Sequence, residues 1–147
     1  MADAMNDAGL IEGDISPSTT APWHFWAIAA VALLWNSFGA WDYTSYQLGL
    51  AQVDPAMEAK LQAAPIWATA AWALGVWASF AGSILLLLRS RHAVTAFIVS
   101  LVAAVISFAW QYSAGLVATP VLPVVILAAV ALLWWYTARM RGEGVLR

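Results

Sequence analysis

Four long apolar runs constrain the fold of this chain more than any other feature of its sequence. They cover about residues 23–43, 66–88, 93–113 and 121–138. Each run reaches the length of about 18 residues that a helix needs to cross the hydrocarbon core of a membrane. Lipid offers the backbone no hydrogen-bonding partner, so a spanning run must be helical. The sequence therefore predicts an all-α membrane protein, a bundle of four transmembrane helices.

The composition leaves no room for a separate soluble domain. Hydrophobic residues make up 63% of the chain and charged residues 10%, whereas about a quarter of a soluble domain is charged. We expect one transmembrane domain at 22–139, preceded by a disordered cytoplasmic tail at 1–21 and followed by a cytoplasmic tail at 140–147. The first tail is acidic, rich in Ser and Thr and free of Lys and Arg, a composition typical of a solvated segment.

The first outer loop, at 44–65, contains a helix-start signal. Asp54 can cap a helix with its carboxylate, and Pro55 suits the first helical position. Apolar and polar residues of the following segment fall on opposite sides of one short helix. This pattern predicts a helix that lies flat at the membrane interface.

Five of the six Lys and Arg residues lie at one end of the predicted bundle. They lie in the turn near 89–92 or follow the fourth run, whereas the first outer loop carries only Lys60. Because Lys and Arg concentrate in cytoplasmic loops, both termini are predicted to be cytoplasmic. We expect a multi-pass protein of a bacterial inner (plasma) membrane. The chain is tryptophan-rich, and five Trp residues fall where interfacial aromatic belts are expected: Trp23, Trp26, Trp41, Trp134 and Trp135.

Polar side chains within the apolar runs gather toward the outer surface. A helix rises about 1.5 Å per residue, so position along a run gives depth. The predicted cluster lies between the first three spans and comprises Asn36, Asp42, Tyr43, Thr69, Trp72, Ser107, Gln111 and Tyr112. One interpretation is a shallow binding pocket with Asp42 as its acid. The other is structural: Asn36 and Gln111 join helices by hydrogen bonds worth about 1 kcal/mol each, and Asp42 reaches interfacial water.

Asn36 and Asp42 are separated around the helix as well as along it. Six residues at 100° each place them about 120° apart on the helical wheel. We therefore expect two separate contacts: an embedded amide with a partner on the second or third span, and a carboxylate at the outer boundary.

The second run carries small residues at every fourth position: Ala71, Gly75, Ser79 and Ser83. Such a row lets helix backbones approach closely in lipid. We expect it to pack against the first or third span, with a homodimer face as the alternative. On the third run, Ser100, Ser107 and Gln111 share a face that should turn inward, and the fourth run should be the most lipid-exposed.

The sequence lacks the residues that several classes of function require. The chain has no Cys and two His, so disulfides and thiolate metal sites are excluded. We find no paired His for haem, no carboxylate cluster for a metal, no Ser/His/Asp set at one depth and no phosphate-binding glycine loop. We therefore expect no enzymatic activity, no cofactor and no bound metal. Basic residues interleaved with aromatic ones are also missing, so no nucleic-acid partner is expected.

Two segments carry a resemblance to known proteins. Trp35-Asn36-Ser37-Phe38-Gly39-Ala40-Trp41-Asp42-Tyr43 and Pro65-Ile66-Trp67-Ala68-Thr69-Ala70-Ala71-Trp72-Ala73-Leu74-Gly75-Val76-Trp77 resemble a group of small, uncharacterised bacterial proteins with four transmembrane helices, whose members are often automatically labelled sugar transporter. The likeness runs from about Trp23 to Ser107. It implies a four-span fold and points to no substrate.

Two functions follow from these observations. The first is a structural or accessory membrane subunit whose partners are lipid and either further copies of the chain or a larger membrane complex. The alternative is a small oligomeric transporter or ligand-binding protein that uses the outer polar pocket. Alternating access normally sets one helix repeat against another, so transport by four helices would require a dimer.

Overall fold

The computed structural model describes residues 19–147 and contains five helices in that range. They are α1 (Trp23–Gln47), α2 (Pro55–Gln62), α3 (Ile66–Leu87), α4 (His92–Ser113) and α5 (Val121–Gly142). The predicted all-α class is confirmed, and each predicted apolar run corresponds to one long helix. The predicted disordered tail lies outside the described residues as far as residue 18.

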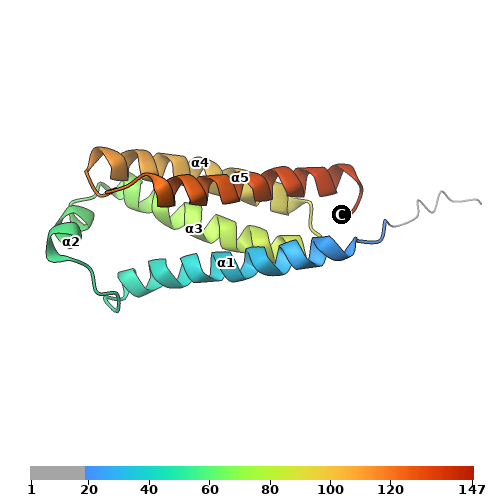
Figure 1. Cartoon of the computed structure of the whole chain (residues 1–147), viewed down its shortest axis with the longest axis horizontal. Coiled ribbons are helices and arrows are strands. Elements are labelled where there is room, and N and C mark those ends of the chain that lie inside the picture. Colours follow the sequence, from blue (N-terminus) through green and yellow to red (C-terminus); the bar gives the residue numbers. More distant parts are fainter. Residues whose placement is uncertain (1–18) are drawn as a thin grey trace, which may run out of the picture.

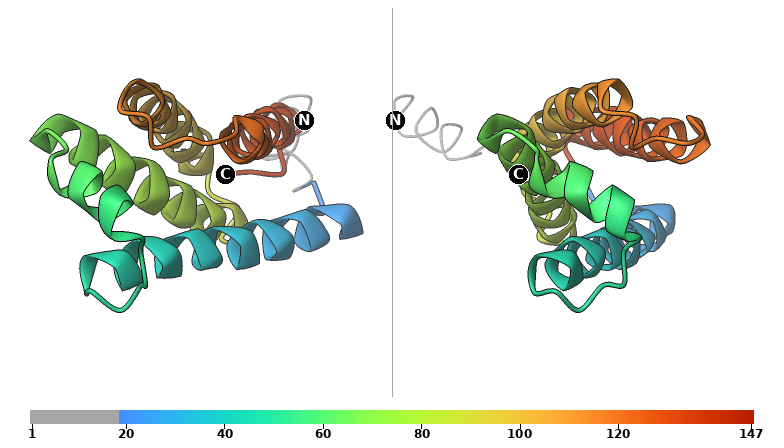
Figure 2. Two further views of the ribbon diagram at one scale, coloured as in Figure 1. Left: turned by 60° about the vertical axis from the view of Figure 1, so that its left-hand side comes forward. Right: turned by 90° about the vertical axis from the view of Figure 1, so that its left-hand side faces the viewer.

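The four long helices run side by side and alternate in direction (Figure 1). α3 packs against both α1 and α4, and α4 packs against α5. α1 and α5 form the two edges of this arrangement and contact each other much less (Figure 2). The start of α1 and the C-terminus lie at one end of the bundle, called here the terminal end, and α2 lies at the opposite end, the α2 end.

Three of the long helices have the length and composition of membrane spans. α3, α4 and α5 are each 22 residues long and apolar enough to cross a membrane. α1 is longer, at 25 residues, but it does not reach the same mean hydropathy. The reason lies in its sequence, where Trp, Tyr, His and Asn side chains are interspersed among the aliphatic ones.

Small residues let α3 occupy the centre of the bundle. The row on α3 is buried at each of its positions: Ala71, Gly75, Ser79 and Ser83. A Cβ added to Gly75 would lie 3.4 Å from the backbone nitrogen of Ala104 on α4, and the Ser100 hydroxyl donates to the Gly75 carbonyl across 2.7 Å. Ser79 and Ser83 contact α1 instead. The row is therefore used within the chain and is not free to form a homodimer face.

The other two long helices place their side chains as their sequences indicate. Ser100 and Ser107 of α4 are buried, at 1% and 3% exposure, whereas Gln111 is half-buried. The predicted face therefore turns inward at its two serines and is partly open at Gln111. In the most apolar stretch of α5 only 11% of residues are buried, against 33% in α3 and in α4. α5 is the least enclosed of these three helices.

α2 begins at the predicted cap. The Asp54 carboxylate accepts hydrogen bonds from the backbone N–H groups of Ala56, at 2.9 Å, and Met57, at 3.4 Å. Later in this helix the Lys60 ammonium donates to the Gly115 carbonyl across 3.0 Å. α2 is thereby joined to the loop between α4 and α5. Its location at a membrane interface stays a prediction.

The last residues of the chain pack into the terminal end. Val145 and Leu146 are 1% and 6% exposed, and they lie in a hydrophobic cluster with Phe25, Ala29, Leu86, Ala93, Phe97 and Met140. The backbone of Arg147 donates to the Arg89 carbonyl across 2.7 Å and accepts from the Arg91 N–H at 2.8 Å. The segment Val145–Arg147 is thus paired with the turn between α3 and α4.

Arg89 holds this turn in an unusual backbone conformation. Its φ of 56° is the one positive value among the non-glycine residues described, and a left-handed residue with a side chain costs about 1–2 kcal/mol. The guanidinium donates to the Val145 carbonyl at 2.9 Å and to the Thr19 carbonyl at 2.8 Å. Hydrogen bonds to two other segments therefore offset the strain of the turn.

Candidate functional site

The Asn36 side-chain amide is hydrogen-bonded to α3 through both its nitrogen and its oxygen. Its nitrogen donates to the Ser83 hydroxyl across 2.7 Å, and its oxygen accepts from the Ser79 hydroxyl at 2.8 Å. Ser83 in turn donates to the Ser79 carbonyl at 3.1 Å. Asn36 is 8% exposed, so this network satisfies a buried amide and fixes α1 against α3. The expected partner of Asn36 lies on the second apolar run.

Gln111 behaves differently from Asn36. Its side-chain nitrogen donates to the Ser107 hydroxyl across 3.0 Å, four residues earlier on the same helix. That bond holds the Gln111 side chain against α4 and joins no second helix. The structural interpretation of the polar cluster therefore fits Asn36 and does not extend to Gln111.

A cavity of about 250 Å³ lies between α1, α3, α4 and α5. Five residues of the predicted cluster line it: Asn36, Asp42, Trp72, Ser107 and Gln111. Its remaining wall is largely apolar and includes Leu122, Ile126 and Val130 of α5. The structure thus brings an acid, an amide and a hydroxyl from α1 and α4 to one cavity, with an aromatic wall from α3.

A second cavity, of about 200 Å³, lies beside the first at the α2 end. Trp72, Ser107 and Gln111 line both cavities, and Thr69 lines only the second. Tyr46 and Gln47, from the last turn of α1, also line the second cavity. Sequence reasoning did not include these two residues because the first apolar run was expected to end near residue 43.

Trp72 is fixed by two aromatic neighbours on α1. The Tyr43 ring is perpendicular to it with ring centroids 5.0 Å apart, and the Tyr46 ring is tilted against it at 5.4 Å. Tyr43 therefore supports the wall of the cavity rather than lining it. Tyr112 is 71% exposed and lines neither cavity, because it follows Gln111 and projects about 100° away from it around the helix.

The Asp42 carboxylate has no cationic partner among residues 19–147. The one ion pair in this part of the chain joins Arg139 and Glu143 at the terminal end. Lys60, the only cation of the first outer loop, donates to Gly115. Asp42 is exposed as well as lining the cavity. Its negative charge is therefore available to a ligand.

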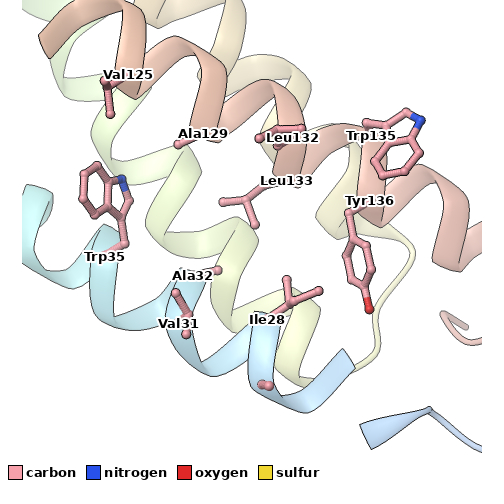
Figure 3. Close-up of a pocket in the computed structure, with 11 residues that line it drawn as sticks. Ile28, Val31, Ala32, Trp35, Val125, Ala129, Leu132, Leu133, Trp135 and Tyr136 are labelled. Atoms are coloured by element: carbon pink, nitrogen blue, oxygen red, sulfur yellow. The ribbon is translucent and has the colours of Figure 1, made fainter. Parts of the chain in front are cut away.

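A larger apolar groove of about 610 Å³ separates α1 from α5 (Figure 3). Its lining includes Ile28, Val31, Ala32 and Trp35 of α1 and Val125, Ala129, Leu132, Leu133, Trp135 and Tyr136 of α5. Trp35 also lines the 250 Å³ cavity, so the two spaces meet at its side chain. Toward the terminal end, the His24 Nδ1 and the Tyr136 hydroxyl lie 2.8 Å apart and form a hydrogen bond between α1 and α5.

Comparison with known proteins adds no family to these observations. The chain matches no family model, and neither a curated protein nor a solved structure is significantly similar to it. The resemblance to small four-span proteins stays a prediction. Among residues 19–147, no three His, Cys, Asp or Glu side chains come together in a group that could hold a metal ion.

Proposed function

We propose that α1 crosses the membrane together with α3, α4 and α5. At about 1.5 Å per residue, its 25 residues span about 38 Å, more than the hydrocarbon core of a bilayer, which is about 30 Å thick. Large apolar side chains of α1 are exposed, among them Val31 at 65%, Leu34 at 72% and Phe38 at 71%. Lipid would cover them. The only Asp, Glu, Lys or Arg in α1 is Asp42, which lies near one end of the helix.

The distribution of cations supports an orientation within an inner membrane. Arg89, Arg91, Arg139, Arg141 and Arg147 all belong to the terminal end, and Lys60 to the α2 end. By the preference of Lys and Arg for the cytoplasmic side, the terminal end is cytoplasmic and the α2 end faces outward. In this orientation Asp42 and two other polar residues of the cavity, Ser107 and Gln111, lie in the outer half of the membrane.

Within that arrangement the chain acts as a membrane ligand-binding protein. The observation that carries this proposal is the cavity lined by Asp42, Ser107 and Gln111 and joined at Trp35 to an apolar groove. Binding sites combine a mostly apolar wall with a few polar groups, in about 300–1,000 Å³. Asn36, whose amide is bonded to α3, positions the wall.

Native mass spectrometry of the purified protein tests this proposal. Gly39 lines the cavity, and a Cβ added to it would meet no atom within 4 Å. Gly39→Leu should therefore occupy the cavity without disturbing the helix contacts. Gly142→Leu is the matched control, because a Cβ there also meets no atom and Gly142 lines neither cavity nor groove. We expect small molecules retained by the wild type to be lost in Gly39→Leu alone, and equal retention by both variants would contradict the proposal.

A second function, accessory subunit of a membrane assembly, is favoured by a different observation. α1 and α5 pack against each other only weakly, and the side chains of residues 19–147 leave the apolar groove between them unfilled. In an assembly this edge of the bundle would contact a partner. Purification in mild detergent should then recover a fixed second polypeptide, and recovery of the chain alone would count against this function.

A further inference from the structure

We propose that the ligand is an amphiphile drawn from the surrounding bilayer, with a cationic head group at Asp42 and a single long alkyl chain in the groove between α1 and α5. This inference rests on the ligand-binding function proposed above and names the chemical class of the ligand. Three observations carry it: the charge at Asp42, the apolar character of the groove, and the junction of groove and cavity at Trp35.

The negative charge of Asp42 determines which head group the cavity can bind. Asp42 is the only charged residue lining the cavity, and no cation among residues 19–147 pairs with it. A cation within about 4 Å of a carboxylate gains several kcal/mol at the effective dielectric of a protein surface, whereas an anion is repelled by as much. Gln111 and Ser107 add hydrogen-bonding groups to the same cavity. A cationic head group, with or without N–H groups, fits the charge of Asp42, and a phosphate or sulfate does not.

The apolar lining and the length of the groove determine which tail the ligand can have. Apart from the indole nitrogens of Trp35 and Trp135 and the Tyr136 hydroxyl, the side chains that line the groove are hydrocarbon (Figure 3). Ile28, near one end of the groove, and Asp42 are fourteen positions apart on α1, which corresponds to about 21 Å along the helix. An extended long alkyl chain covers such a distance. Burying it between α1 and α5 costs no desolvation of polar groups, because the groove offers almost none.

The volume of the groove favours an alkyl chain over a partner helix as its occupant. A membrane-spanning helix about 30 Å long and 10 Å wide displaces roughly 2,400 Å³, about four times the 610 Å³ of the groove. The hydrogen bond between His24 and Tyr136 also joins α1 to α5 at the terminal end, which keeps the groove narrow there. A partner helix could therefore cover the groove only from outside.

The groove and the 250 Å³ cavity meet at Trp35 and so form one continuous site. The Trp35 indole contributes to the wall of the groove and of the cavity, and on α5 the cavity residue Ile126 follows the groove residue Val125 directly. A ligand that enters from the side of the bundle between α1 and α5 therefore reaches Asp42 without passing the α2 end. The polar part of the site lies toward the α2 end, and the groove runs from the middle of α1 toward the terminal end, so a bound amphiphile lies along the helix axes.

Binding of radiolabelled hexadecyltrimethylammonium to the full chain in nanodiscs tests the proposal, with empty nanodiscs as the background. We expect saturable binding that weakens at least tenfold in Asp42→Asn. Asp54→Asn removes the same charge at the same end of the bundle, and Asn caps a helix as well as Asp does, so its affinity should equal that of the wild type. Hexadecyl sulfate, with the same chain and the opposite charge, should compete at least tenfold more weakly than unlabelled hexadecyltrimethylammonium.

The groove is tested with a matched pair on α5. Ala129 lines the groove, whereas its neighbour Ala128 is exposed and does not. Ala129→Phe should abolish saturable binding of the long-chain cation, and Ala128→Phe should leave it intact. Thermal unfolding of each variant in nanodiscs verifies that the fold is retained.

The outcomes separate this inference from the function on which it rests. If amphiphiles of every head group bind equally and only Ala129→Phe prevents binding, the charge assignment is wrong and the ligand-binding function survives. If no amphiphile binds saturably, while Gly39→Leu still displaces another retained molecule, the ligand class is wrong. If a second polypeptide accompanies the wild type and is lost in Ala129→Phe, a protein occupies the groove and the inference is overturned.

Discussion

Asn36 and Ser83 lie 47 residues apart in the chain and are joined by a buried hydrogen bond of 2.7 Å between α1 and α3. With the Ser79 hydroxyl as second partner at 2.8 Å, the amide connects α1, the least apolar of the four long helices, to the centre of the bundle. Polar contacts of this kind stabilise helix association in lipid, where burial of apolar surface provides little driving force.

Replacement of Asn36 should loosen the contact between α1 and α3. Asn36→Leu removes both interhelical bonds and leaves the Ser79 hydroxyl without its acceptor. We expect the free energy of unfolding in detergent micelles to fall by about 1 kcal/mol. Ser37→Ala, at the next position of α1, serves as control and should change it little. An equal loss in both variants would assign the effect to α1 in general.

Even the smallest larger side chain at position 82, that of Ala, should destabilise the protein. A Cβ added there would lie 3.1 Å from the Phe97 ring, which is fully buried and so has little room to move. Overpacking of this kind costs about 1–3 kcal/mol, and we expect Gly82→Ala to lower the midpoint of thermal unfolding. Gly39→Ala, where the added Cβ meets no atom within 4 Å, should leave the midpoint unchanged or raise it, since Ala favours a helix over Gly.

Leu146 should contribute to stability although it lies beyond the last helix. Its side chain is 6% exposed within the hydrophobic cluster of the terminal end. Leu146→Ala should cost about 2 kcal/mol of unfolding free energy and increase cleavage of the C-terminal segment by added protease. Arg147→Ala is the control, because Arg147 pairs with Arg89 and Arg91 through its backbone. Identical protease sensitivity in the two variants would show that burial of Leu146 does not hold the segment.

The hydrogen bond between His24 and Tyr136 should limit the separation of α1 and α5. Tyr136→Phe removes the hydroxyl that lies 2.8 Å from His24 Nδ1. The chain contains no Cys, so spin labels at Ala30→Cys and Ala128→Cys report only on these two helices. We expect the distance distribution between the labels to broaden in Tyr136→Phe. Tyr112→Phe, on the exposed side of α4, should leave it unchanged, and superimposable distributions in all three proteins would rule out this role.

Local signals in the sequence predicted most of the fold. The apolar runs located α1, α3, α4 and α5, and the Asp54-Pro55 pair located the start of α2. Serines seven residues apart on the third run fall on one helix face, and both are buried. Such predictions succeed because helix formation and facial periodicity depend on neighbours within a few residues.

The groove and the packing of the last residues could not be predicted in this way. Whether α1 and α5 pack directly against each other depends on side chains far apart in sequence. The sequence of an apolar helix face that contacts lipid also resembles that of a face that contacts another helix. Val145 and Leu146 follow the fourth run in a segment too short to show a period. The cluster prediction included Tyr112 because depth alone was counted, and depth does not specify the direction around the helix.

Under the proposed ligand-binding function, the open edge between α1 and α5 determines how the concentration of ligand must be measured. A molecule that reaches Asp42 from the side of the bundle approaches in two dimensions, so occupancy depends on its mole fraction in the bilayer. The same aqueous dose will then give different occupancies at different ratios of lipid to protein. Titrations at a fixed lipid ratio, reported as mole fraction of ligand in lipid, give an affinity that can be compared between variants.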